Sequence, residues 1–145
     1  MVGTKWSAAP WGTALALVTV MAAAAAPAAA HGQASDRAQL AQRIALTNSD
    51  NGRSVTASLG DDNEVRLTSY RENGLTWTWS TPTSSDSTVL RRTAGRTAPN
   101  GDASATFHAE HDGTATITAQ RRCSPDPGRI CPLVVTPWKV TVEAK

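Results

Sequence analysis

The chain has almost no excess of charge of either sign. Of its 145 residues, 14 are Lys or Arg and 12 are Asp or Glu, which gives a formal net charge of +2 at pH 7. Lys5 lies in a segment that we expect to be removed, which leaves 13 basic residues against 12 acidic ones. Proteins that bind nucleic acid or anionic membranes through charge carry a basic patch or stripe. The mature domain is therefore expected to bind neither.

The chain has one long hydrophobic run, and it lies at the N-terminus. Lys5 precedes a largely apolar stretch over 12–26, and three alanines at 28–30 give the small-x-small pattern that signal peptidases cleave. A membrane anchor is the alternative, but the uninterrupted run is shorter than the ~20 residues that a bilayer-spanning helix needs. We therefore expect 1–30 to be a signal peptide and the mature protein to be secreted into the extracellular or cell-envelope space.

Cysteine is scarce, with only Cys123 and Cys131 in the chain. In an exported protein, two cysteines this close are expected to form one local disulfide. Closing so short a loop stabilises a fold by about 2–3 kcal/mol on the chain-entropy model. A metal-binding pair is the alternative, but there is no further Cys, and the three histidines show no ligand spacing relative to these two. The sequence predicts a disulfide and no cofactor.

From Arg43 onward, no segment shows a helical period of useful length. Short segments rich in Thr, Val, Ile and Trp alternate with turn residues such as Asn51-Gly52, a pattern typical of an all-β domain. Strands are predicted over 43–47, 54–59, 64–68, 75–79, 88–91, 103–109, 114–121 and 133–142.

The spacing of the turns favours an immunoglobulin-like sandwich of two sheets and seven or eight strands over 43–145. A flexible N-terminal segment over 31–42 is expected to precede it. An up-and-down barrel is the alternative, but the long irregular links near Thr81 and Gly95 fit crossovers between two sheets better.

Aromatic residues make up only 5% of the chain, so the domain has few large side chains with which to fill a core. Trp77 and Trp79 share one face of a predicted strand, and Trp138 lies on the last strand. An exposed row of aromatics would suit carbohydrate stacking. Because Tyr70 and Phe107 are the only other aromatics of the mature chain, we expect Trp77 and Trp138 in the core. For Trp79 both interpretations stay open.

The candidate catalytic and metal-binding residues have simpler explanations. His31, as a new N-terminal residue, could chelate copper with a second histidine, but His108 and His111 are three apart and point to opposite faces of a strand. The acidic residues of 61–64 adjoin a turn glycine, and 110–112 form a solvated corner. No serine lies in a strand–elbow–helix context. We expect neither an enzyme nor a metal site.

A set of short motifs points to a known family. They are Leu59-Gly60-Asp61, Val65-Arg66-Leu67, Gly74-Leu75-Thr76-Trp77, Phe107, Gly113-Thr114 and Trp138-Lys139-Val140-Thr141-Val142. In this order the chain resembles the chagasin-like family over about 44–142. These proteins are exported, immunoglobulin-like inhibitors of papain-type cysteine proteases. The resemblance implies that three loops at one end of the sandwich enter the protease cleft.

The loop motifs themselves differ from the family pattern. Where the family has Asn-Pro-Thr-Thr-Gly, this chain has Tyr70-Arg71-Glu72-Asn73-Gly74, and only the glycine matches. The second motif, Gly-x-Gly, corresponds to Asn100-Gly101-Asp102. The third, Arg-Pro-Trp, corresponds to Arg121-Arg122-Cys123-Ser124-Pro125. The resemblance is thus stronger in the scaffold than in the loops, and fold similarity alone does not carry activity.

The connections 70–74, 95–102 and 123–131 are expected to cluster at one end and to bind another protein. Within the cysteine-bounded loop, Arg129-Ile130 could serve as bait for a trypsin-like protease, although the sequence favours a merely stabilised connection. We expect a secreted, monomeric, non-enzymatic domain whose partner is a papain-type cysteine protease. A structural or adhesive cell-envelope module and a copper-dependent enzyme remain the alternatives.

Overall fold

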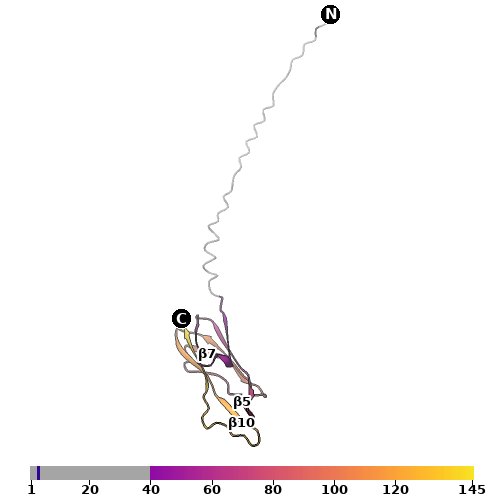
Figure 1. Ribbon diagram of the computed structural model, residues 1–145. Helices are drawn as coiled ribbons and strands as arrows, with labels where there is room; N and C mark the ends of the chain where they lie inside the picture. Colours follow the sequence, from indigo (N-terminus) through magenta and orange to yellow (C-terminus); the bar gives the residue numbers. More distant parts are fainter. Residues whose placement is uncertain (1–2, 4–39) are drawn as a thin grey trace. The chain divides into compact units, whose positions relative to one another are not determined.

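The computed structural model describes Gly3 and residues 40–145 (Figure 1). The expected signal peptide, most of the 31–42 segment and His31 lie outside the described residues. By its internal contacts the chain divides into two compact units, and the second, Arg37–Lys145, holds all the strands. Among the described residues no helix is long and apolar enough to cross a membrane.

The described residues form an all-β sandwich, as predicted, with eleven strands in three sheets. The first sheet has the order β1-β3-β8-β7, and its strands are Arg43–Thr47, Asp62–Leu67, Ala103–Ala109 and Leu90–Thr97. The second has the order β2-β11-β9-β6, with Ser54–Ala57, Trp138–Ala144, Gly113–Ala119 and Thr83–Ser84. The third has the order β10-β5-β4, with Arg121–Pro125, Leu75–Trp79 and Tyr70–Glu72. A short 3-10 helix, η1, spans Asn48–Asp50.

The two four-stranded sheets enclose one core, because alternate residues of their strands point inward. Strand β8 buries every second residue from Ala103 to Ala109, and β11 does the same from Trp138 to Ala144. Phe107 and Trp138 are the largest fully buried side chains. Most of their buried neighbours on β8 and β9 are alanines, which leave room for the two aromatic rings. A chain poor in aromatics thus fills its core by pairing a few large residues with many small ones.

The tryptophans lie inside, as predicted for Trp77 and Trp138, which are 5% and 1% exposed. Trp79 is also buried, at 7% exposed, so the carbohydrate-stacking interpretation of that residue is wrong. Two indole N–H groups are satisfied by backbone carbonyls: Trp79 Nε1 donates to Thr68 O at 3.0 Å, and Trp138 Nε1 donates to Thr47 O at 3.1 Å. Each ring therefore also ties a loop to the core.

The three additional strands, β4, β6 and β10, lie in or beside segments that were predicted as loops, and several predicted strand boundaries were also wrong. The chain does not become irregular after Arg91, because β7 continues to Thr97 along the edge of its sheet, with a bulge between Arg92 and Ala94. From Arg91 onward its side chains are exposed, so no alternation in the sequence reveals it. At the C-terminus, β11 begins only at Trp138, and the predicted strand residues 133–137 lie in an irregular segment.

Candidate protein-binding site

The β4–β5 hairpin projects the first of the expected loops. Its turn consists of Asn73 and Gly74 alone, with φ angles of 53° and 75°, and Glu72 pairs directly with Leu75. A two-residue turn with positive φ at both positions matches the right-handed twist of its strands, and Asn-Gly favours it strongly. The expected loop 70–74 is therefore wrong in extent: Tyr70–Glu72 is strand β4, and only the turn residues form a loop.

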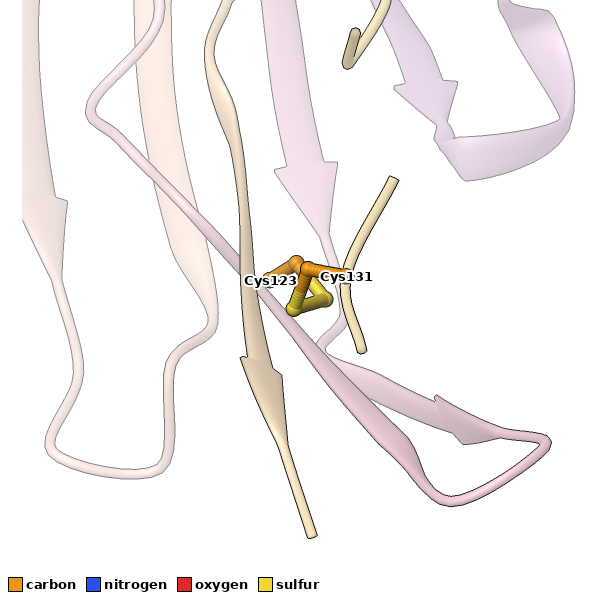
Figure 2. Close-up of a disulfide and its surroundings, with 2 residues drawn as sticks. All are labelled: Cys123 and Cys131. Carbon is orange, nitrogen blue, oxygen red and sulfur yellow. A yellow bond between two sulfur atoms is a disulfide. The ribbon is translucent and has the colours of Figure 1, made fainter. Parts of the chain in front are cut away.

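Strand β10 adds to the other side of β5 and begins the third connection. Cys123 lies opposite Trp77 in this ladder, and it forms the predicted disulfide with Cys131, with a Cα–Cα distance of 6.0 Å. Figure 2 shows the disulfide joining β10 to the segment that returns beside it. Figure 1 shows β5 and β10 at the end of the domain away from the C-terminus.

An aromatic stack stiffens this small sheet. The Tyr70 and Trp77 rings lie 6.2 Å apart with planes inclined at 21°, and the Arg121 guanidinium sits 4.3 Å above the Trp77 ring. Arg121 Nη1 also donates a 2.7 Å hydrogen bond to Tyr70 Oη. Cation–π contacts of this kind stabilise a fold by about 0.5–2 kcal/mol. Tyr70 and Arg121, both predicted to contact a partner, thus also hold the sheet together.

The hairpin turn and the third connection are joined to one another. Asp126 N donates to Gly74 O at 2.9 Å, and Arg71 Nη2 pairs with Asp126 Oδ2 at 2.5 Å. The stem of Arg129 lies across Gly74, where an added Cβ would come within 2.9 Å of Arg129 Cγ. Glycine is favoured at position 74 by its positive φ, and the absence of a side chain there also lets the Arg129 stem pack against the turn.

The second connection is the turn 98–102 between β7 and β8, shorter than the expected 95–102 because Gly95 belongs to β7. Trp79 N donates to Gly101 O at 3.0 Å, which joins this turn to the end of β5. The Asp102 carboxylate accepts hydrogen bonds from Ser69 N at 2.7 Å and Ser69 Oγ at 2.9 Å. Those bonds, first the one from the backbone amide, lower the pKa of Asp102. The second connection is therefore joined to the base of the β4–β5 hairpin, whereas the third is joined to its turn.

A polar groove of about 630 Å³ separates this turn from the third sheet. Thr76 and Thr78 line one wall, Asn100 lines the other, and Arg122 lies at its margin. Arg122 is exposed, and the ion pairs within residues 40–145 involve other arginines. The groove therefore offers hydroxyl, amide and guanidinium groups to a polar partner.

The segment that follows the disulfide carries the exposed apolar side chains of this end. Ile130, Leu133 and Val134 are 87%, 102% and 83% exposed. None of the backbone–backbone hydrogen bonds within residues 40–145 involves 130–137. Leu133 and Val134 were predicted to lie in a buried strand because both are apolar, and their exposure on the surface was not predicted. The flanking Pro132 and Pro137, which cannot donate to a ladder, were the signal against a strand.

The predicted site residues fall into two groups. The first is exposed at the binding end: Arg71, Glu72, Asn73, Asn100, Arg122, Arg129 and Ile130. The second is partly buried and shapes the end: Tyr70, Gly74, Gly101, Arg121, Cys123 and Cys131. The second group positions the first, because turns, stack and disulfide fix the backbone from which the exposed side chains project.

The histidines and acidic residues weighed as catalytic candidates have structural contacts. His108 Nδ1 lies 2.8 Å from Asp62 Oδ1, and His111 Nδ1 lies 2.8 Å from Thr88 O. The buried Asp61 accepts hydrogen bonds from Gln42 N and Ser58 N, both at 2.9 Å. Within the described part of the chain, no three His, Cys, Asp or Glu side chains gather as metal ligands would.

Comparisons with known proteins give similarity in solved structures alone: no family model and no curated protein matches the chain. The cysteine protease inhibitor EhICP2 from Entamoeba histolytica is 16% identical, with a TM-score of 0.48, over 74% of this chain and 99% of its own. Amebosin is 14% identical, with a TM-score of 0.42, over 74% and 100%. The inclusion body protein PixA from Burkholderia cenocepacia is 13% identical, with a TM-score of 0.49, over 75% and 98%. The similar structures thus include one protein described as a cysteine protease inhibitor.

Proposed function

We propose that this protein is a secreted, non-enzymatic domain that binds another protein through the end formed by its three connections. The most specific form of the proposal is inhibition of a papain-type cysteine protease. Export would follow cleavage of the 1–30 signal peptide, and the oxidising space reached in this way would keep Cys123 and Cys131 joined.

The observation that carries the proposal is that hydrogen bonds join the second and third connections to the β4–β5 hairpin. Asp126 N binds Gly74 O, Trp79 N binds Gly101 O, and Ser69 binds the Asp102 carboxylate. A surface fixed by its own hydrogen bonds and a disulfide loses little conformational entropy when a partner binds. The exposed apolar residues beyond Cys131 and the polar groove near Arg122 then supply the contact surface.

The class of partner comes from the resemblance of the sequence to the chagasin-like family. Inhibition by loops requires a wedge that fills a cleft without presenting a bond for rapid cleavage. In the present chain we assign this role to the two-residue hairpin turn at Asn73-Gly74, supported by the turn at Asn100-Gly101, which bonds to the base of the same hairpin. Because the loop motifs differ from the family pattern, the affinity for a protease and the choice of protease depend on the side chains that this chain has in its loops.

The proposal is tested by titrating papain with the purified exported protein and measuring residual hydrolysis of a small peptide substrate. We expect inhibition at micromolar protein or below, weakened by about tenfold or more in Arg122→Ala. Arg91→Ala is the matched control, because Arg91 is an exposed arginine on β7 that pairs with Glu110 at the opposite end. No inhibition at micromolar protein, together with retention on cell envelopes, would favour the adhesive module instead.

A further inference from the structure

The loop between the two cysteines has a defined backbone conformation. The proposed binding of a papain-type protease does not require it. Asp126-Pro127-Gly128-Arg129 forms a tight turn in which Arg129 N donates to Asp126 O at 2.9 Å. Gly128 has a φ of 80° at the third position, after a proline at the second, which is the type II pattern. The chain then leaves the turn at Arg129 and continues through Ile130 and Cys131 without regular structure.

The Arg129–Ile130 peptide bond is anchored on both sides. Before it, Asp126 is held by the ion pair with Arg71 and by the hydrogen bond to Gly74 O. After it, Cys131 is joined to Cys123 by the disulfide, eight residues apart in sequence. Pro127 and Pro132 further restrict the backbone on each side. The bond therefore lies in a small closed loop that cannot open when a partner approaches.

The backbone that follows this bond is free to bind. Ile130 is 87% exposed, and 130–137 take part in none of the backbone–backbone hydrogen bonds within residues 40–145. Proteases hold their substrates as extended segments through main-chain hydrogen bonds and a pocket for one side chain. Arg129 is exposed; its stem rests on the Gly74 turn, so rotation about side-chain bonds alone turns its guanidinium outward.

We propose that Arg129–Ile130 is a substrate-like bond for a trypsin-like serine protease, so that this domain has a second inhibitory site independent of papain-type proteases. The arginine fits a specificity pocket that carries an aspartate. Arg129 would enter that pocket, while Ile130 and Cys131 occupy the cleft on the leaving-group side. The rigid loop lowers the ordering cost of binding, and it also resists the rearrangement that completes hydrolysis.

The chemistry of this bond explains why binding would inhibit. The protease serine oxygen adds to the Arg129 carbonyl carbon, and its histidine takes the serine proton and passes it to the Ile130 nitrogen as the peptide bond breaks. Arg129 is then an ester of the serine, and Ile130 carries a free amine. Because the disulfide keeps that amine in the site, it can attack the ester again, restore the peptide bond and return the proton. Hydrolysis needs a water molecule to reach the ester first.

The test uses the exported protein, trypsin, and a trypsin whose active-site serine is replaced by alanine. We expect the wild type to inhibit hydrolysis of a small arginine ester and to form a complex with the inactive trypsin. Arg129→Ala should weaken both by at least about 100-fold, while Arg129→Lys retains them within about tenfold, because lysine also enters the pocket. Arg91→Ala is the control for loss of an exposed arginine, and thermal unfolding of each variant establishes that it is folded.

Mass measurement after long incubation with active trypsin gives the second readout. Cleaved protein should gain the mass of one water and remain one molecule until the disulfide is reduced, when it separates after Arg129. The proposal is overturned if the wild type neither inhibits trypsin nor binds its inactive form at ten micromolar, roughly the weakest useful affinity. It is equally overturned if Arg129→Ala inhibits as well as the wild type, or if the bond is cut at once without inhibition. The result of the papain titration neither supports nor contradicts this proposal, because the two inhibitory sites are independent.

Discussion

The two ends of the sandwich differ in how far their polar and apolar side chains are exposed to solvent. At the end near the C-terminus, the Gly60 turn is closed by Asp61, which is 6% exposed and has both carboxylate oxygens bound by backbone amides. At the other end, Arg71 and Asp126 pair in the open, and Ile130, Leu133 and Val134 face solvent. Both ends are therefore stabilised by side chains, but the second end also leaves an ion pair and apolar side chains exposed to solvent.

The largest effect should come from the core that both ends share. Phe107 is fully buried between the sheets, so Phe107→Ala should lower the free energy of unfolding by about 3–5 kcal/mol. Urea denaturation measures this change. Val134→Ala is the comparison at the binding end, because Val134 is 83% exposed, and it should alter stability by less than about 0.5 kcal/mol. Equal losses in the two variants would show that the 130–137 segment packs against the core.

Substitution of one glycine at each end, Gly60 and Gly101, allows a direct comparison of the two ends. Gly60 and Gly101 have φ angles of 91° and 92°, but a Cβ at Gly60 would meet nothing within 4 Å, whereas one at Gly101 would lie 2.3 Å from Thr78 Cγ2. Alanine at either position adds backbone strain of about 1–3 kcal/mol. At Gly101 the clash should add about 1–3 kcal/mol more and displace the turn.

Urea denaturation of Gly60→Ala and Gly101→Ala, followed by papain titration of both, separates these effects. Only Gly101→Ala should weaken inhibition beyond the loss expected from unfolding. Similar stability in the two variants would mean that Thr78 moves aside without cost, and the close approach between turn and sheet would then contribute nothing.

The disulfide should make only a moderate contribution to the free energy of unfolding, although it joins two segments at the candidate site. Replacing both cysteines, Cys123→Ser with Cys131→Ser, should lower the free energy of unfolding by about 2–3 kcal/mol, because the closed loop is short. The domain should stay folded, since the core cluster lies outside that loop. Differential scanning calorimetry measures the loss, and a reductant added to the wild type should reproduce it. Complete unfolding of the double variant would show that the third sheet is needed by the whole sandwich.

Acid should have the smallest effect, and it should act where Asp50 and Asp102 lie, at the end away from the C-terminus. Hydrogen bonds lower the pKa of Asp50, first from the Thr47 amide, and the pKa of Asp102, first from the Ser69 amide. A carboxyl group with a lowered pKa in the fold stabilises it above its unfolded pKa, and this contribution is lost as the pH falls through the folded pKa.

The free energy of unfolding should therefore decrease as the pH drops below about 4, and urea midpoints across this range measure it. Asp102→Asn should flatten this dependence, whereas Asp112→Asn, at an exposed turn position, should leave it unchanged. A wild-type midpoint that stays constant down to about pH 2 would contradict the role assigned to these hydrogen bonds.

The sequence predicted the half-buried parts of the fold well, because only there does alternation record burial. Residues 75–79, 103–109 and 114–119 lie in strands as expected, and the cysteines are joined. Strand β7 could not be found in this way, since its edge position leaves it solvated on both faces beyond Leu90.

At the end that carries the candidate site, the structure differs in detail from what the sequence predicted. Asn73-Gly74 is a strong hairpin signal that comparison with a family loop obscured. The cation–π contact of Arg121 and the pairing of Arg71 with Asp126 depend on neighbours that meet only in the folded chain. Residue type alone could not separate the arginines that hold this end together from those that are free.

Gly74 limits how this end can diversify. It is the one residue of its turn that matches the family loop, and in this structure a side chain there would strike Arg129. New binding preferences are therefore expected elsewhere, at exposed positions such as Glu72 and Leu133, whose side chains make no hydrogen bond or ion pair within residues 40–145. Because position 74 favours glycine, this surface consists of a turn position whose residue type is constrained and exposed positions whose side chains are free to vary.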